Sequence, residues 1–284
     1  MTFQPLVLAP VQAHGRFLVF DARPDADVRS ALARLRDVDA RGAVVGFGAP
    51  LVARLGATVA GLRAFPSVSG RVAFPVTQGD AWAFVGGDDV GDVLDRARAL
   101  RATLGDRFAL REDVATFRYR GGRDLTGYVD GTENPKDDKA VAAAICADGS
   151  TFVAVQRWVH DLDAFARFAP DDRDRAIGRR HRDDVELADA PPSAHVKRTA
   201  QESFDPTAFV VRRSMPWGGV AEHGLYFVAY GATLDAFERQ LVRMAGLDDG
   251  VVDALATFTR AVTGGYYWCP PLRDGALDLR ALGL

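Results

Sequence analysis

Three short segments of the chain carry residue types suited to proton transfer, metal binding and charge stabilisation. The first, residues 127–131 (Gly-Tyr-Val-Asp-Gly), places Asp130 between glycines, where a ligand can approach the carboxylate closely. A buried carboxylate in such a loop has a raised pKa and can shuttle protons, whereas an exposed one makes an ordinary Asp-Gly turn. Taken alone, the spacing favours the turn.

The second segment has a single histidine after a rigid pair of prolines. His195 follows Pro191 and Pro192 by a few residues, so the backbone before it is restricted and the ring can be held in one orientation. A neutral imidazole is a common ligand of haem iron. A lone histidine in a loop is more commonly a surface or hydrogen-bonded residue, and the sequence by itself leaves both interpretations open.

The third segment is an apolar strand, residues 209–211, that ends in Arg212 and Arg213. Because side chains alternate across a strand, the two arginines face opposite sides and one of them points inward. An inward arginine requires an anionic partner, such as a carboxylate, a propionate or a peroxide oxygen. The alternative is an ordinary arginine at the end of a strand.

Hydrophobic spacing predicts the elements that must position these segments. The predicted strands are 16–22, 43–47, 81–85, 114–119, 151–159, 208–213 and 225–230, and the predicted helices are 25–38, 90–104, 162–168, 234–245 and 251–262. Strands that alternate irregularly with helices favour an α+β fold of antiparallel sheets with peripheral helices, built from ferredoxin-like units. A His-Gly pair opens a strand in each half, and the likeness of the halves predicts two domains, residues 1–125 and 126–284.

Composition excludes several classes of function. The chain has 284 residues, of which 48% are hydrophobic and 26% charged, as is typical of a water-soluble globular protein. Its formal charge of −3 offers no positive field to nucleic acid or to an anionic membrane. No apolar run approaches the roughly 18 residues of a membrane span, and the N-terminus lacks a basic region and a twin-arginine signal. We therefore expect a cytoplasmic protein with no nucleic-acid or membrane partner.

Cysteine and glycine patterns exclude several cofactor sites. Cys146 and Cys269 are the two cysteines and lie far apart in sequence, so we expect reduced thiols rather than a zinc ribbon or a redox pair. Any haem is held non-covalently, because the chain has no Cys-x-x-Cys-His. The glycine patterns of dinucleotide-binding and P-loop proteins are also missing.

Taken together and in this order, the three segments resemble the motifs of dye-decolorising peroxidases. The Gly-x-x-Asp-Gly run with its Thr-Glu-Asn-Pro continuation is similar to the family signature, residues 194–199 (AHVKRT) resemble the stretch with the proximal histidine, and residues 211–216 (VRRSMP) resemble the strand with the distal arginine. The resemblance covers most of residues 115–270 and is closest to the bacterial cytoplasmic branch, type B. It implies duplicated ferredoxin-like domains of the dimeric α+β barrel type.

The resemblance implies a haem b peroxidase that reduces hydrogen peroxide. Bulky aromatic or phenolic donors, dyes included, are then oxidised in one-electron steps through a ferryl intermediate, compound I. One non-covalent haem b per chain is implied, with the iron ligated axially by His195 and the ligand ring hydrogen-bonded by Asp253. Asp130 is implied to move the peroxide proton and Arg212 to stabilise the charge that develops as the oxygen–oxygen bond breaks. The partners implied are peroxide, small aromatic donors and further copies of the chain in a homo-oligomer.

Four other positions follow from the same resemblance. Ser214, expected in the catalytic set, stands where many relatives have asparagine, and its shorter side chain puts the hydrogen bond to peroxide there in question. Arg179, Thr132 and Phe227 lie in segments similar to those that contact the haem. Two other functions stay open: a haem carrier or iron-releasing protein without peroxide turnover, and a haem-free ferredoxin-like binding module. A carrier would not need Asp130 together with Arg212.

Overall fold

The computed structural model describes residues 2–284, apart from the side chain of Asp37. The strands are β1 (His14–Ala22), β2 (Ala43–Phe47), β3 (Val68–Ser69), β4 (Ala73–Phe74), β5 (Ala81–Gly87), β6 (Phe108–Phe117), β7 (Thr151–His160), β8 (Val211–Arg212), β9 (Met215–Gly218), β10 (His223–Gly231), β11 (Thr259–Ala261), β12 (Gly265–Cys269), β13 (Leu272–Arg273) and β14 (Ala276–Leu277). The α-helices are α1 (Arg29–Ala33), α2 (Ala49–Arg54), α3 (Val90–Leu104), α4 (Asp137–Ala144), α5 (Leu162–Arg167), α6 (Pro170–Ile177), α7 (His195–Arg198) and α8 (Asp235–Met244). Short 3-10 helices connect them; the one used below is η5 (Ala254–Thr257).

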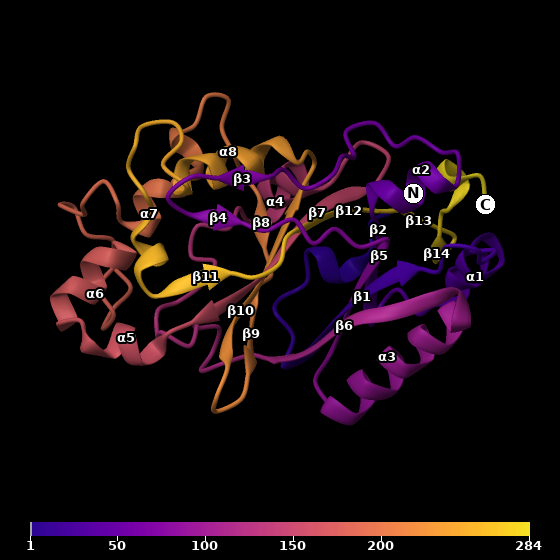
Figure 1. Ribbon diagram of the computed structural model, residues 1–284, viewed down its shortest axis with the longest axis horizontal. Coiled ribbons are helices and arrows are strands. Elements are labelled where there is room, and N and C mark those ends of the chain that lie inside the picture. Colours follow the sequence, from indigo (N-terminus) through magenta and orange to yellow (C-terminus); the bar gives the residue numbers. More distant parts are fainter. Residues whose placement is uncertain (1) are drawn as a thin grey trace.

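One antiparallel sheet of ten strands forms the centre of the molecule (Figure 1). Its order is β11-β7-β12-β2-β5-β1-β6-β9-β10-β8, and β7 also pairs with β10 from Gly224 opposite Val159 to Gly231 opposite Phe152. This extra pairing joins the two ends of the order, so the strands from β7 through β12, β2, β5, β1, β6, β9 and β10 close into a barrel-like sheet. Closure removes the long unpaired edges that an open sheet would expose.

Helix α3 covers one face of this sheet because its apolar residues recur at helical spacing. Val93, Ala97, Leu100 and Leu104 are buried against β1 and β5, and the carboxylate of Asp89 caps the helix by accepting hydrogen bonds from the amides of the first turn. Helix α8 lies over the other half of the sheet (Figure 1). These helices supply the apolar surface that buries the outer side chains of the strands.

An aromatic cluster fills the opposite face of the sheet. Phe17 of β1 stacks on Tyr226 of β10 with ring centroids 4.0 Å apart and an interplanar angle of 5°. Trp82 and Tyr267 continue the cluster at centroid distances of 6.0 Å from Phe17 to Trp82 and 6.1 Å from Trp82 to Tyr267. All four side chains are fully buried, so this face is a packed core shared by strands from both halves of the chain.

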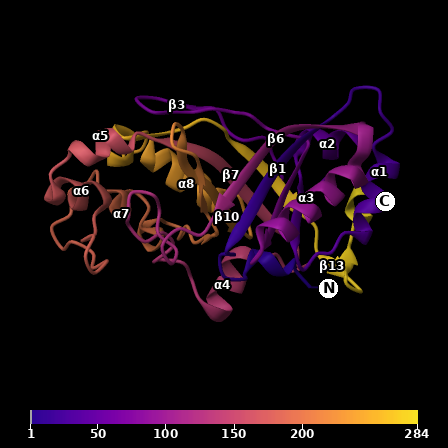
Figure 2. The same ribbon diagram turned by 90° about the horizontal axis from the view of Figure 1, so that it is seen from below.

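The two ends of the elongated molecule differ in character. The N- and C-termini lie together at one end, where Thr2 pairs with Leu272, and helices α5, α6 and α7 lie at the other end in both views (Figures 1 and 2). The loops around residues 119–136 and 178–194 are also at that second end. It is there that the residues singled out in the sequence come together.

Most of the predicted elements are present, and one is wrong. The strand predicted at 43–47 and the helix predicted at 90–104 have those bounds in the structure. The helix predicted at 251–262 is instead the short 3-10 helix η5 followed by strand β11, which pairs with β7. The segment is rich in Val and Thr, and pairing with an available strand edge outweighs its helical apolar spacing.

Two expectations about the whole chain can also be compared with the structure. Cys146 and Cys269 are both free thiols, as predicted. Within residues 2–284, no helix is both long enough and apolar enough to cross a membrane.

Candidate active site

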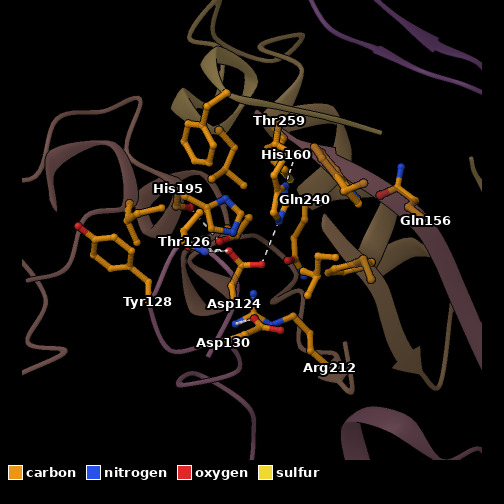
Figure 3. A pocket seen from close by; sticks show the side chains of 18 of the residues that line it. Asp124, Thr126, Tyr128, Asp130, Gln156, His160, His195, Arg212, Gln240 and Thr259 are labelled. Atoms are coloured by element: carbon orange, nitrogen blue, oxygen red, sulfur yellow. Dashed lines mark hydrogen bonds and ion pairs between the residues drawn. The ribbon is translucent and has the colours of Figure 1, made fainter. Parts of the chain in front are cut away.

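A cavity opens between the outer face of strands β7 and β10 and the surrounding helices and loops (Figure 3). It encloses about 860 Å³ of space free of protein atoms, counting its open mouth. Three of the residues predicted from sequence to carry chemistry, His195, Asp130 and Arg212, line it. Most of the rest of its wall is apolar, and these lining residues are Val129, Trp158, Ile177, Leu225, Phe227, Phe237, Met244, Leu255 and Phe258.

The imidazole of His195 is held by a buried carboxylate. His195 begins helix α7, and its Nδ1 lies 2.7 Å from Oδ2 of Asp253, whose side chain is only 3% exposed. The other oxygen of Asp253 accepts a hydrogen bond from the amide of Leu255 at 2.9 Å and so caps η5. The carboxylate is therefore fixed from both sides. Across residues 2–284, Nε2 of His195 has no hydrogen-bond partner, which leaves this nitrogen free for a ligand.

Asp130 and Arg212 form the second charged group of the cavity. An Nη of Arg212 lies 3.6 Å from a carboxylate oxygen of Asp130, and the side chains are 14% and 24% exposed respectively. Nε of Arg212 is buried and has no hydrogen-bond partner in the described part of the chain. The guanidinium group therefore has an unused donor in an apolar surrounding, which favours the binding of a further acceptor.

Asn134 fixes the backbone from which Arg212 projects. Its Oδ1 accepts a hydrogen bond from the Arg212 amide at 2.8 Å, and its Nδ2 donates to the Arg212 carbonyl at 3.0 Å. A single side chain thus pairs with Arg212 as a neighbouring strand would. It also ties β8 to the loop that carries Asp130, which lies four residues earlier.

The remaining predicted residues line either the cavity or the depressions beside it. Phe227 lines the same cavity. Ser214 lies with Asp130 and Arg212 along an adjoining depression, where its hydroxyl accepts a hydrogen bond from the amide of Val228 at 3.4 Å. Ser214 is not among the residues that line the main cavity.

Arg179 and Thr132 lie in a second adjoining pocket that His195, Asp130 and Arg212 also line. Arg179 is buried and makes an ion pair with Glu133, and its Nη1 donates to the carbonyl of Asp184 at 2.9 Å. Its Nε makes no hydrogen bond to any residue from 2 to 284 and is buried. The sequence-predicted residues thus surround one cavity and its two side openings.

Comparison with known proteins assigns the family. Residues 121–274 match the family described as Dyp-type peroxidase, C-terminal. A dye-decolorizing peroxidase of Brevibacterium linens is 33% identical over 93% of this chain and 79% of its own length. The chain belongs to the dye-decolorising peroxidase family. The protein is therefore an oxidoreductase of a family of haem peroxidases, as the sequence motifs predicted.

Solved structures of other dye-decolorising peroxidases share the fold. A dye-decolorizing protein from V. cholerae is 30% identical with a TM-score of 0.87, and the match covers 98% of both chains. DyPB from Rhodococcus jostii RHA1 is also 30% identical with a TM-score of 0.87, over 95% of this chain and 97% of its own. These similarities confirm the mixed fold of helices and antiparallel strands with a barrel-like sheet.

Sequence reasoning missed two polar residues of this dye-decolorising peroxidase's cavity, His160 and Asp124. Nε2 of His160 lies 3.0 Å from Oδ2 of Asp124, and Nδ1 lies 2.6 Å from the hydroxyl of Thr259. One signal was available: Gln156, Trp158 and His160 alternate along β7 and so share a face, and two of these three side chains are polar.

The electrostatics of Asp124 differ from those of an exposed aspartate. Burial by itself raises the pKa of its carboxyl group, but hydrogen bonds from His160 and Thr126 outweigh burial and lower the pKa below its ordinary value of 3.8. Asp124 is therefore an anion at neutral pH. The cavity has two carboxylates on one loop, each held by a different basic side chain.

Proposed function

We propose that this protein is a haem b peroxidase that reduces hydrogen peroxide and oxidises aromatic or phenolic donors, dyes among them. The observation that carries the proposal is the geometry of His195: Nδ1 is braced by Asp253 at 2.7 Å, while Nε2 is free at the wall of an apolar cavity that also contains Asp130 and Arg212. A braced imidazole with a free nitrogen suits an axial ligand of iron. The pair of an acid and a guanidinium suits peroxide cleavage.

The residues of the cavity fit a haem. Its lining is mostly apolar, as a porphyrin requires, and one histidine is available as a ligand. The buried Nε atoms of Arg212 and Arg179 lack hydrogen-bond partners among residues 2–284, and a haem brings carboxylates that guanidinium groups bind. Variants of the Rhodococcus jostii protein DypB were solved in complex with heme, which supports the same cofactor here.

His195 would hold the iron, and Arg179, Thr132 and Phe227 would contact the cofactor. When bound, the haem supplies the two electrons that cleave the oxygen–oxygen bond and recovers them one at a time from donor molecules. Asp253 would keep the His195 ring oriented and make Nε2 a stronger electron-pair donor by accepting a hydrogen bond from Nδ1.

Asp130 would take a proton from one oxygen of hydrogen peroxide and return it to the other, so that water leaves when the bond breaks. Arg212, within 3.6 Å of Asp130, would stabilise the negative charge that develops between the oxygens. Ser214 would act from the adjoining depression, where its hydroxyl is already bonded to the amide of Val228. Because Ser214 does not line the main cavity, we expect its contribution to peroxide binding to be small.

We also propose that the fold is a duplicated pair of ferredoxin-like units, residues 1–125 and 126–284. The strand pairing supports this: β1 lies between β5 and β6 in the first half, and β7 lies between β10 and β12 in the second. In each half a helix follows the first strand and another precedes the last strand. This is the connectivity of a βαββαβ unit.

The absorption spectrum of the full chain, expressed with haem supplied, tests the proposed function. We expect a Soret band in the wild type, its loss or a large change in His195→Ala, and an unchanged band in His223→Ala, a half-buried histidine in the β9–β10 hairpin. One equivalent of hydrogen peroxide should change the wild-type band, and an aromatic donor should restore it. A band that does not respond to peroxide would indicate a haem carrier, and the lack of any band would indicate a haem-free binding module.

A further inference from the structure

His160 is a buried polar residue of the cavity wall to which the proposed function gives no part. Its side chain is 6% exposed, and both ring nitrogens are occupied, Nε2 by Asp124 at 3.0 Å and Nδ1 by Thr259 at 2.6 Å (Figure 3). His160 ends β7, Thr259 begins β11 and Asp124 lies in the loop that follows β6. One imidazole therefore links three segments that are far apart in sequence.

Asp124 also bonds to residues of its own loop. Oδ1 accepts hydrogen bonds from the amide and the hydroxyl of Thr126 at 2.8 and 2.6 Å, while Oδ2 faces His160. The Asp124 amide donates to the carbonyl of Tyr128 at 2.9 Å, and the Gly127 amide donates to the carbonyl of Asp124 at 2.9 Å. The five residues 124–128 are thus folded around one carboxylate.

Asp130 depends on this folded loop for its position. It follows the turn by two residues, and its amide donates to the carbonyl of Gly122 at 3.3 Å. Arg123 pairs with Val129 in an isolated bridge, and its Nη1 donates to the carbonyl of Gly127 at 2.7 Å. These contacts lie within the loop. Among the hydrogen bonds of residues 2–284, the one between Asp124 and His160 is the only side-chain hydrogen bond that joins residues 124–128 to the strands of the cavity wall.

The link between His160 and Asp124 does not depend on the charge of the ring. The hydroxyl of Thr259 has one proton, which it can donate to the carbonyl of Val159 at 2.9 Å or to Nδ1 of His160 at 2.6 Å. In the first case Nδ1 donates to Thr259 and the ring is an imidazolium; in the second the ring is neutral. Nε2 carries a proton toward Asp124 in both cases, so the hydrogen bond that holds the loop is retained.

We propose that His160 and Asp124 are positioning residues that hold the loop of Asp130 against β7, and that Thr259 orients His160 for this task. The inference rests on the proposed role of Asp130 in proton transfer. A shift of about 1 Å in a proton-transfer group slows a reaction by up to roughly 100-fold, so a loop support of this kind affects the rate without contacting peroxide.

The test compares His160→Ala, which removes the hydrogen bond, with His160→Gln, whose side-chain amide can still donate to Asp124. His223→Ala is the matched control, because that histidine makes its hydrogen bond in the β9–β10 hairpin, to the carbonyl of Gly219. In the full haem-loaded chain, hydrogen–deuterium exchange of peptides that cover residues 119–131 reports the loop directly. Stopped-flow measurement of the reaction with peroxide reports the position of Asp130.

We expect His160→Ala to speed exchange of the loop amides about tenfold and to slow the reaction with peroxide roughly 10- to 100-fold, with little change in KM for the donor. His160→Gln should restore both values to within a few-fold of the wild type, and His223→Ala should change neither. Thr259→Val removes the hydroxyl that orients His160, together with its hydrogen bond to the Val159 carbonyl, and leaves the hydrogen bond to Asp124 in place. It should give a smaller increase in exchange than His160→Ala, which keeps the test available if His160→Ala fails to fold.

The proposal would be overturned if residues 119–131 of His160→Ala exchanged as slowly as those of the wild type. If His160→Ala does not fold, the same result in Thr259→Val would overturn it. So would a glutamine variant as defective as the alanine variant, because the imidazole itself would then be required. The exchange comparison is independent of turnover: a wild type that fails to react with peroxide would refute the proposed function, while the exchange of the loop would still decide whether His160 positions it.

Discussion

Two adjacent arginines at the end of β8 have separate tasks. Arg212 reaches the cavity beside Asp130, whereas Nε and Nη2 of Arg213 donate to the carbonyls of Ala9 and Leu8 at 2.6 and 2.7 Å. The alternation of side chains along a strand predicts that they diverge, but it does not say which one faces the cavity. That choice came from the likeness of residues 211–216 to the family motif.

The first prediction is that Arg212→Leu slows the reaction with hydrogen peroxide at least as much as Asp130→Ala does. The leucine removes the group proposed to stabilise charge in the transition state and leaves Asp130 without its ion pair at 3.6 Å. Loss of such a group typically costs about 100-fold or more in rate. Stopped-flow absorbance of the Soret band under pseudo-first-order peroxide provides the rate constants.

Arg213→Leu is the matched control for this comparison. Apart from one hydrogen bond to the Arg212 carbonyl, which Asn134 also bonds, its side-chain hydrogen bonds are with the N-terminal segment, so we expect a lower melting temperature and a nearly normal rate with peroxide. Rates close to the wild type in both Arg212→Leu and Asp130→Ala would refute the proposed roles of this pair.

A second prediction concerns acid stability and follows from Asp124. Its folded pKa lies below the ordinary value of 3.8, so the folded state binds the proton less tightly than the unfolded state does. The stabilisation is complete above the unfolded pKa and is lost as the pH falls through the folded pKa. Asp124→Asn should therefore melt at a lower temperature than the wild type at pH 6, and this difference should narrow as the pH falls below about 4.

Melting followed by circular dichroism between pH 3 and 6 checks this prediction. Asp163→Asn, at an exposed position of α5, serves as the comparison and should leave the melting temperature nearly unchanged at every pH. A difference between wild type and Asp124→Asn that stays constant over the whole range would show that the ionised carboxylate contributes nothing.

At the residue scale, the sequence could identify the residues proposed to carry the chemistry but not the residues proposed to position them. His195, Asp130 and Arg212 lie in motifs with distinctive neighbours, and the structure brings them to one cavity. His160 and Asp124 were missed because their importance depends on a contact between residues 36 positions apart. The alternation along β7 places His160 on the cavity face, but no local pattern encodes its contact with Asp124.

At the scale of elements, one side chain, that of Asn134, joins the loop of Asp130 to strand β8. β8 has only two residues, and Asn134 bonds both the amide and the carbonyl of Arg212, at 2.8 and 3.0 Å; Nη1 of Arg213 also donates to this carbonyl, at 2.9 Å. Asn134 is the single asparagine of the chain, which is a signal that composition could have provided. The strand predicted at 208–213 is shorter than expected, and the backbone groups of Ala208 and Val210 are bonded by Gln201 and Gln240 rather than by another strand.

A third prediction is that Asn134→Ala destabilises the protein and slows its reaction with peroxide while haem is retained. The Arg212 amide loses its partner and the Arg212 carbonyl keeps only the hydrogen bond from Nη1 of Arg213, at a cost of about 1 to 3 kcal/mol. In a chain of this size such a loss lowers the melting temperature by roughly 2 to 10 °C. Differential scanning calorimetry and the Soret band measure the two effects.

Asn134→Asp keeps the acceptor for the Arg212 amide and loses only the donor to the carbonyl. We therefore expect it to lie between the wild type and Asn134→Ala in melting temperature. An alanine variant that melts like the wild type would mean that water replaces both hydrogen bonds and that Asn134 does not fix Arg212.

At the scale of the whole molecule, the two halves of the barrel-like sheet meet at two narrow seams. β6 pairs with β9 only through Thr116 and Trp217, and β12 pairs with β2 only through Trp268 and Phe47. Within each half the ladders are far longer; β1 pairs with β5 over seven residues of each strand. The backbone hydrogen bonds of the sheet therefore join the halves over a short length only, and outside the sheet Thr2 pairs with Leu272 and the Thr77 amide donates to the Gly264 carbonyl.

Sequence patterns predicted the strands of both halves but not how the halves join. Period-two spacing is local, so β1 and β10 were recognised separately. The contact of Phe17 with Tyr226 spans more than 200 residues, and only the closed sheet brings these rings together. The helix at 251–262 was wrongly predicted for the same reason, namely that a long-range contact decides the structure. Part of this segment forms strand β11 because β7 offers a partner.

The last prediction follows from this shared aromatic core. If the stack of Phe17 on Tyr226 couples the halves, Phe17→Ala should destabilise both of them, although the proposed haem ligand His195 is in the other half. Replacing a fully buried phenylalanine by alanine typically costs about 3 to 5 kcal/mol. In urea, the loss of secondary structure by circular dichroism and the loss of the Soret band should coincide in the wild type, and both midpoints should fall together in Phe17→Ala.

Leu94→Ala removes an apolar side chain that is 41% exposed on α3 and should shift neither midpoint appreciably. A variant in which secondary structure melts earlier but the Soret band keeps its wild-type midpoint would show that residues 126–284 hold their cavity without help from the first half.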